Sequence, residues 1–199
     1  MNRIAHAAFC VPFGMIKMVF IKALHFNSFT APTLSMVSPH TEITIDKGAK
    51  LHIGNRFKMR DGAKIRVRNG AACTIGDNVL INSNNILACR EKIEIGNGCE
   101  LGPNVQIYDH DHDFRTEGGI KAGKYKTSPV KIGDNVWVGA NTVVLRGTEI
   151  GDNCVIAAGS VLKGTFPANS VVVQKRETGI RGGYWRINSI NLEVRYNAA

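Results

Sequence analysis

Aliphatic residues return every six positions along the second half of the chain. The series runs Ile132, Val138, Val144, Ile150, Ile156 and Leu162. A period of six matches neither an α-helix, which turns every 3.6 residues, nor a strand whose side chains alternate with a period of two. It predicts a coil with three flat sides of six residues each, in which one aliphatic side chain per side points inward.

The tripeptide Ile-Gly-Asp/Asn marks equivalent positions in successive coils. It occurs at 53–55, 75–77, 95–97, 132–134 and 150–152. Glycine, asparagine and aspartate tolerate the backbone angles of a turn, and parallel ladder bonds stack each coil on the next. Without a non-repeating segment at 109–129, residues 45–173 correspond to six coils of 18 residues. We expect local changes of register near 69–73 and 90–92.

The first forty residues have a different pattern. Apolar side chains recur at helical spacing, at Phe9, Phe13, Ile16, Phe20 and Leu24. This spacing predicts a short amphipathic helix in an N-terminal arm, 1–40. Lys17 and Lys22 interrupt the apolar run, which argues against a transmembrane span, and no small-x-small cleavage site indicates a signal peptide. The helix packs on the body of the protein or on a neighbouring subunit, or it lies on a membrane surface as a peripheral contact.

Composition agrees with a slim, repetitive core. Aromatic residues are 7% of the chain, and 21 of the 199 residues are glycine. An apolar content of 44% argues against disorder. The five cysteines form no CxxC motif, so we expect free thiols and a cytoplasmic location.

The formal net charge of +9 indicates an anionic partner. Basic residues alternate along the early coils, at Arg56, Lys58, Arg60, Lys64, Arg66 and Arg68. They form either a docking stripe for an anionic glycan or a lipid-linked phosphate, or a solvated face. The chain has no recognised nucleic-acid-binding module, so we expect no nucleic acid as partner.

The interruption of the repeat at 109–129 is the candidate functional segment. It opens with Asp109-His110-Asp111-His112-Asp113-Phe114. Imidazole can accept a proton from a hydroxyl group near neutral pH, and a neighbouring carboxylate can orient it. The alternative is a solvated polar loop without chemistry.

Three strings, 102–108, 132–139 and 156–161, carry a family resemblance. In them the chain resembles the hexapeptide-repeat acyltransferases, in particular sugar O-acetyltransferases that act on maltose, galactosides or capsular and exopolysaccharides. The resemblance implies an all-β fold, with a left-handed parallel β-helix of about six coils at 41–173. The N-terminal helical arm, the inserted loop 109–129 and a C-terminal tail, 174–199, complete the chain. It also implies a homotrimer, acetyl-CoA as co-substrate, no metal, and a glycan or sugar acceptor.

The same resemblance implies roles for individual residues. His112 is the expected general base, with His110 as the alternative, and Asn84 lies near the acceptor and the thioester unless it only continues an asparagine ladder. The residues expected to bind acetyl-CoA are Trp137, Gly139, Ala140, Ala158, Lys163 and Gly164. Cys89 departs from the pattern, because the simple sugar enzymes carry an acceptor-binding aspartate there. The turn at 174–177 also departs, which leaves Lys175, Arg176 and Arg181 as candidates for the cofactor phosphates.

The predicted function is therefore acetyl transfer to a sugar hydroxyl in capsular or exopolysaccharide synthesis, with the histidine as base and no covalent intermediate. Three alternatives stay open. The first is N-acetylation of an amino sugar on the same fold. The second is a zinc enzyme like the carbonic anhydrases of this coil, for which His110 and His112 need a third ligand such as His52. The third is a non-catalytic scaffold.

Overall fold

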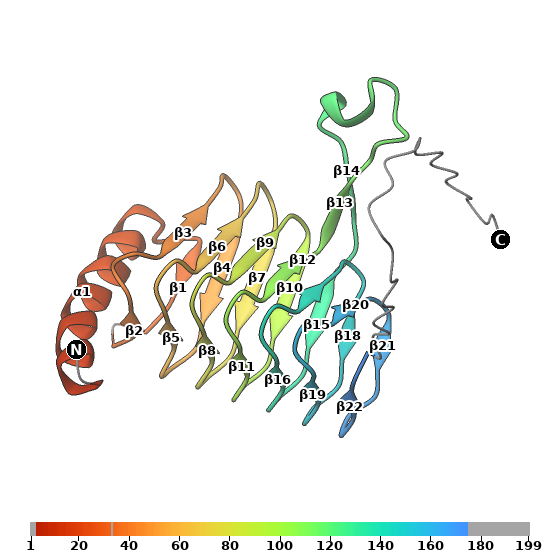
Figure 1. Ribbon diagram of the computed structural model, residues 1–199. Coiled ribbons are helices and arrows are strands. Elements are labelled where there is room, and N and C mark those ends of the chain that lie inside the picture. The colour runs from red at the N-terminus through yellow and green to blue at the C-terminus, as the bar shows by residue number, and fades with distance from the viewer. Residues whose placement is uncertain (1–2, 33, 175–199) are drawn as a thin grey trace, which may run out of the picture.

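The chain folds into a parallel β-helix with one helix across its N-terminal end. The structure is a computed structural model that describes residues 3–32 and 34–174, with side chains described from residue 11 onward. Helix α1 (Arg3–Leu24) is followed by strands that wind into three parallel sheets, which we call A, B and C (Figure 1). The predicted all-β fold of about six coils with an N-terminal helix is confirmed.

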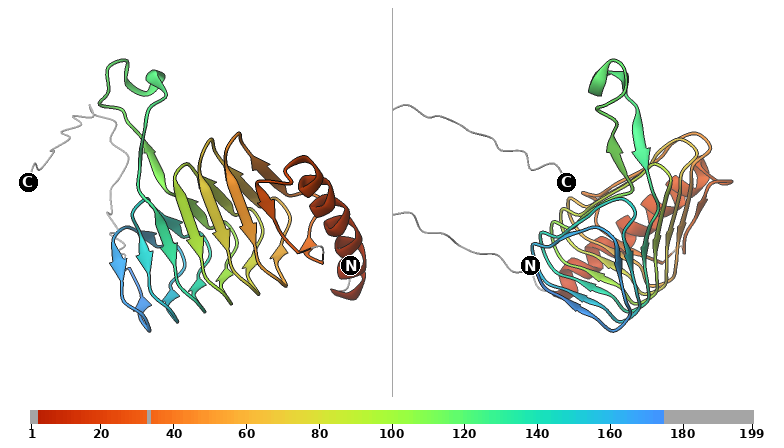
Figure 2. Two further views of the ribbon diagram at one scale, coloured as in Figure 1. Left: turned by 180° about the vertical axis from the view of Figure 1, so that it is seen from behind. Right: turned by 90° about the vertical axis from the view of Figure 1, so that its right-hand side faces the viewer.

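The sheets form the three sides of a triangular prism (Figure 2, right). Sheet A contains β1 (Phe29–Thr30), β4 (Lys50–Ile53), β7 (Ala72–Ile75), β10 (Lys92–Ile95), β15 (Val130–Ile132), β18 (Glu149–Ile150) and β21 (Thr165–Phe166). Sheet B contains β2 (Met36–Val37), β5 (Lys58–Met59), β8 (Leu80–Ile81), β11 (Glu100–Leu101), β16 (Trp137–Val138), β19 (Val155–Ile156) and β22 (Val171–Val172). Sheet C contains β3 (Glu42–Ile45), β6 (Lys64–Val67), β9 (Ile86–Cys89), β12 (Gln106–Tyr108), β17 (Val143–Val144) and β20 (Val161–Leu162).

The coils shorten along the chain. Stacked partners are 22 residues apart for Ile53 and Ile75, 20 for Ile75 and Ile95, 18 for Ile132 and Ile150, and 16 for Ile150 and Phe166. The predicted uniform length of 18 residues is therefore wrong for the early coils. Their extra residues lengthen strands such as β6 and β7 to four residues, around the segments where we expected changes of register. The ladders also begin at β1 and β2, before residue 41.

The repeated tripeptide has a structural role at the corner between sheets A and B. Its isoleucine is buried in the core in every coil, and its third residue binds the coil below. The Asp77 carboxylate accepts the backbone N–H of Asn55 at 2.7 Å, and the Asp134 carboxylate accepts that of Asn97 at 2.6 Å. Asparagines with φ near +57° follow in the turn, so that short polar side chains close each coil.

Helix α1 covers the first coil with one face only. Met18 and Ile21 are buried against β1 and β2, and the Lys17 ammonium donates to the Thr41 hydroxyl at 2.8 Å. The stripe predicted from sequence lies on the opposite, outward face, because Ile16, Phe20 and Leu24 are each more than 60% exposed. Among the described residues, no helix is long and apolar enough to span a membrane.

Candidate functional site

The segment that interrupts the repeat forms a hairpin that projects from one corner of the prism. It leaves sheet C after β12 and returns to sheet A at β15 (Figure 2, right). Strand β13 (His110–His112) pairs antiparallel with β14 (Tyr125–Thr127), and a short 3₁₀ helix, η1 (Gly119–Ala122), lies in the distal part of the loop. The hairpin therefore holds both candidate histidines on one strand, outside the regular coils.

Asp109 anchors the base of this hairpin. Its carboxylate is fully buried and accepts the backbone N–H groups of Arg90, Glu91 and Lys92 at 2.7–2.9 Å. It also lies 2.9 Å from Nδ1 of His110. Burial alone raises the pKa of a carboxyl, but the hydrogen bonds from His110 and from these amides outweigh it and hold the pKa of Asp109 below its usual value. Asp109 is thus a buried, ionised carboxylate.

His110 is held in one orientation by its surroundings. Its side chain is 14% exposed and makes edge contacts with the rings of Tyr108 and Tyr125, at centroid distances of 6.0 and 5.4 Å. When Nδ1 donates to Asp109, Nε2 is the nitrogen left to accept a proton. This pair has the chemistry of an oriented base, but the ring is largely enclosed.

His112 is the accessible histidine. It is exposed, and its ring centroid lies 4.6 Å from that of Tyr125. A pocket of about 200 Å³ adjoins it, lined also by Asp111, Asp113, Phe114, Arg115, Lys126 and Arg146. Arg146 pairs with Asp111 at 2.6 Å, and Lys126 pairs with Asp113 at 3.4 Å. The pocket therefore combines a base, an apolar ring and three basic side chains against two acidic ones.

Tyr125 and Arg90 are site residues that the sequence did not single out for this role. Tyr125 contacts both histidine rings, and the Arg90 guanidinium lies 3.5 Å from the centre of its ring. Tyr125 follows a polar stretch without periodicity, so only the antiparallel pairing of His112 with Tyr125 brings them together. The stack ties the hairpin to the turn that Asp109 binds.

Most residues expected to bind acetyl-CoA lie along the corner between sheets B and C. Trp137 points outward from β16 and is 55% exposed, and Gly139 and Ala140 follow it in the corner. Ala158 occupies the same corner one coil later. A Cβ on Gly139 would lie 2.5 Å from the Ala158 backbone nitrogen, so the two coils meet there through bare backbone. The structure thus offers exposed backbone beside an aromatic ring.

Asn84 belongs to the same corner, two coils before Ala140. It takes up a left-handed conformation with φ 59°, as Asn104 and Asn141 do in the following coils. The Asn104 amide donates to Asn141 at 3.1 Å. This geometry fits the asparagine-ladder interpretation and leaves the Asn84 side chain exposed.

Lys163 and Gly164 lie elsewhere, at the corner between sheets C and A after β20. That corner also carries the hairpin. About six residues of extended chain, or roughly 20 Å, separate the two corners across sheet C. Within one chain the histidines and Trp137 are therefore not brought together.

The described cysteines are buried and free, at Cys73, Cys89, Cys99 and Cys154. The Cys89 thiol donates to the Ala72 carbonyl inside the coil, so Cys89 does not present an acceptor-binding group at the surface. Burial raises the pKa of Cys73 to about 12 and that of Cys99 to about 11. These thiols remain protonated and are unsuited to act as nucleophiles.

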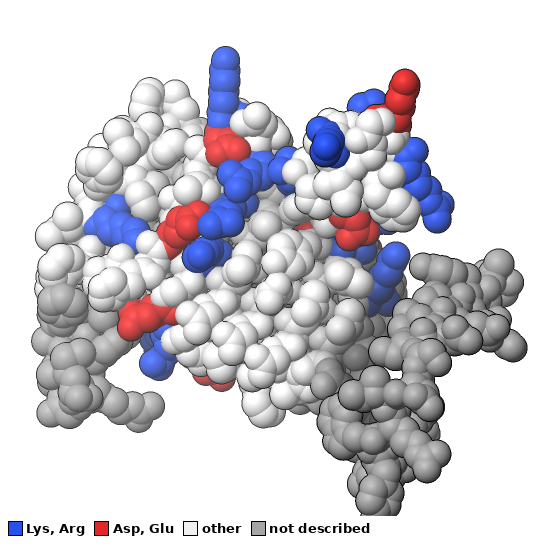
Figure 3. All heavy atoms as spheres, turned by 45° about the horizontal axis from the view of Figure 1, so that its top comes forward, with Lys and Arg blue, Asp and Glu red and all other residues white. Residues whose placement is uncertain are grey.

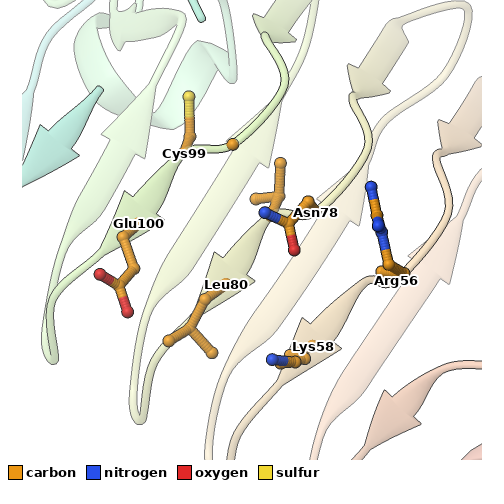
Figure 4. Close-up of a pocket in the computed structure, with 8 residues that line it drawn as sticks. Arg56, Lys58, Asn78, Leu80, Cys99 and Glu100 are labelled. Atoms are coloured by element: carbon orange, nitrogen blue, oxygen red, sulfur yellow. The ribbon is translucent and has the colours of Figure 1, made fainter. Parts of the chain in front are cut away.

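The predicted basic stripe is divided between two faces. On sheet C, Arg66 pairs with Glu42 at 2.6 Å and Arg68 pairs with Asp46 at 3.6 Å, and Figure 3 shows basic and acidic side chains interspersed. Arg56 and Lys58 instead line a pocket of about 270 Å³ against sheet B (Figure 4). Figure 4 shows Glu100 in the same pocket. Among the described residues, no group of three His, Cys, Asp or Glu side chains is placed to hold a metal.

Comparisons with known proteins agree with the architecture. The family described as bacterial transferase hexapeptide (six repeats) matches residues 129–164. The galactoside O-acetyltransferase of Escherichia coli K12 is 35% identical over 62% of this chain and 50% of its own. The putative lipopolysaccharide biosynthesis O-acetyl transferase WbbJ of the same organism is 29% identical over 64% of this chain and 69% of its own.

Among solved structures, the AntD N-acyltransferase of Bacillus cereus, in complex with dTDP and coenzyme A, has the same fold. It superposes with a TM-score of 0.60 at 18% identity, over 80% of this chain and 89% of that one. The chain spans about half the length of the curated relatives it matches. The periodic coils, the hairpin and these matches together place the chain in the hexapeptide-repeat transferase family.

Proposed function

We propose that the protein is an acetyl-CoA-dependent O-acetyltransferase that acts on a hydroxyl group of a sugar or glycan. The observation that carries this proposal is the position of His112, an accessible imidazole beside a pocket of about 200 Å³ on the projecting hairpin. Two curated relatives named as O-acetyltransferases support the reaction class, and WbbJ supports a surface polysaccharide as the acceptor. The buried free thiols suit a reducing cytoplasm.

In this proposal His112 acts as the general base. Bound acetyl-CoA supplies the acetyl group as a thioester. His112 removes the proton of the sugar hydroxyl as its oxygen forms a bond to the acetyl carbon; the carbon–sulfur bond breaks, and the departing thiolate receives the proton from the imidazolium. Asp109 and His110 fix the strand that carries His112, and Trp137 with the backbone at Gly139 and Ala158 holds the pantetheine arm.

A homotrimer of parallel prisms completes the site. One chain carries His112 and Lys163 at one corner and Trp137 and Ala158 at another. Side-by-side packing of prisms brings one corner of a chain against the other corner of its neighbour. Each of three sites then takes its base from one subunit and most of its acetyl-CoA contacts from the next.

The charges around His112 favour a hydroxyl acceptor over an amine. Three basic and two acidic side chains line the pocket. An amino sugar enters as an ammonium ion, which this excess of positive charge opposes. A neutral or acidic sugar meets no such opposition, and an acidic glycan suits the net charge of +9.

Titration with acetyl-CoA by calorimetry, followed by thiol-release assays with sugars, amino sugars and surface glycans, tests the proposal. We expect one saturable site per chain and release of coenzyme A with a hydroxyl acceptor. Absence of binding by the folded protein contradicts the transferase function. Release with amino sugars alone supports N-acetylation instead.

Mixed oligomers test the shared site. A His112→Gln chain and a Trp137→Ala chain are each expected to be inactive alone. Refolded together, they regain part of the activity, because some interfaces combine the two intact corners. If activity does not return although mass measurements show mixed trimers, each chain holds a complete site.

A further inference from the structure

The outward face of α1 is apolar and uncovered. Ile16, Val19, Phe20 and Leu24 are 53–67% exposed, and Phe26, just beyond the helix, is 75% exposed. The opposite face already supplies the contacts that hold the helix on the first coil, through Met18 and Ile21. An apolar helix face of this kind marks an interaction surface, because solvated helix faces are normally polar.

Charge around this face indicates what covers it. The chain has no acidic residue before Glu42, whereas Arg3, Lys17 and Lys22 are basic. Beside the helix, a groove of about 280 Å³ is lined by Val11, Leu34 and Met36 and also by Arg56 and Lys58. Apolar side chains with a rim of cations and no nearby carboxylate suit the headgroup region of an anionic bilayer.

The position of α1 leaves this face free in the proposed trimer. The helix lies across the end of the prism, whereas side-by-side subunits contact its long sides (Figure 1; Figure 2, left). Parallel prisms also set three copies of the helix at the same end of the assembly. Three weak attachments to one surface then act together.

We propose that the N-terminal end of the molecule binds the surface of an anionic membrane, with Ile16, Phe20 and Leu24 inserted among the lipids. Lys22, Arg56 and Lys58 lie at the edge of this face and contact lipid phosphates. The helix lies in the plane of the interface. Membrane binding holds the transferase where lipid-linked glycans are found, but it does not depend on the proposed activity.

Co-sedimentation with vesicles tests the proposal. The full chain is added to phosphatidylcholine vesicles and to mixed phosphatidylcholine–phosphatidylglycerol vesicles. We expect binding to the mixed vesicles that falls as salt rises, and at least about a tenfold loss of partitioning in the double variant Ile16→Gln/Phe20→Gln. Val171→Gln, which removes an equally exposed side chain from the far end of the prism, is the matched control and leaves binding unchanged.

Charge and insertion are measured separately. Lys22→Gln weakens binding to the mixed vesicles, whereas Lys131→Gln, on sheet A away from the helix, does not. A Phe20→Trp variant gains a blue shift of its fluorescence with mixed vesicles beyond that of the parent chain. Unfolding curves and acetyl-CoA titrations of every variant separate this result from loss of fold or of the transferase site.

Equal binding of the double variant and the parent chain overturns the proposal, as does absence of binding to either vesicle. A change in particle mass of the double variant by light scattering, without a change in vesicle binding, shows that a second copy of the chain covers this face instead. Equal binding to neutral and anionic vesicles removes the role of the cations.

Discussion

The carboxylate of Asp109 lies 2.9 Å from Nδ1 of His110, and the same carboxylate accepts three backbone amides of the turn at 90–92. One buried charge therefore connects the last turn of a regular coil with the first residue of the projecting hairpin. This contact sets the direction in which the hairpin leaves the prism. The position of His112, two residues further on, depends on it.

Replacement of Asp109 by asparagine is expected to destabilise the fold by about 2–4 kcal/mol, because a neutral amide accepts fewer of these hydrogen bonds and leaves buried N–H groups unpaired. Urea unfolding measures the change. Asp111→Asn is the matched control, since Asp111 is half-exposed and its ion pair with Arg146 contributes less than about 1 kcal/mol. Equal losses in both variants would rule out the anchoring role.

Acid is expected to remove the same contribution. Folding lowers the pKa of Asp109 below 3.8, so the unfolded chain takes up the proton at a higher pH than the folded chain. The stability that Asp109 contributes is therefore complete well above pH 3.8 and is lost as the pH falls through the lower, folded-state pKa. Unfolding free energies of the parent chain and of Asp109→Asn should differ at neutral pH and converge in strong acid. A constant difference would contradict this assignment.

The two histidines are expected to differ in activity assays. His112→Gln removes the proposed base and lowers kcat by about 10²–10⁴-fold. His110→Gln lowers kcat less, because His110 positions the strand and its ring is largely enclosed. His40→Gln, an exposed histidine on an early coil, is the control and keeps full activity. A larger loss in His110→Gln than in His112→Gln reverses the two roles.

Gly14→Ala is expected to loosen the helix. A Cβ at Gly14 would lie 2.7 Å from the Ser35 carbonyl oxygen and 2.8 Å from the Val37 nitrogen, so α1 must move away from β2. Helix propensity favours alanine by about 1 kcal/mol, yet we expect a net loss of about 1–2 kcal/mol. Hydrogen exchange of the α1 amides reports it. Ala23→Gly, at an exposed helical position, lowers propensity without changing the contact with β2.

Arg56→Asn is expected to stabilise the fold by about 0.5–1 kcal/mol. Arg56 has φ 55°, whereas the equivalent turns use asparagine or glycine, which tolerate this conformation better. The reciprocal variant Asn153→Arg should lose a similar amount in thermal unfolding. A loss of stability in Arg56→Asn would mean that the guanidinium makes contacts that compensate for the strain.

The repeat could be predicted from sequence because it follows a local rule. An inward aliphatic residue and a short polar turn residue, such as Ile132 and Asp134, recur at fixed spacing, and each coil needs only its neighbours. The interruption at 109–129 was visible for the same reason, since it breaks that spacing. The resemblance added the left-handed winding and the roles of single residues, which the pattern does not contain.

The tertiary structure decided the features that depend on long-range contacts. Long sides in the early coils changed the register, because strands such as β6 and β7 extend to four residues. The antiparallel pairing of His112 with Tyr125, and the burial of Asp109 under the turn at 90–92, follow from chain segments that meet only in the folded state. The apolar stripe of α1 was evident in the sequence, but only packing showed that it faces outward. Both faces of this helix are apolar, and the close contact at Gly14 selects the one that meets the first coil.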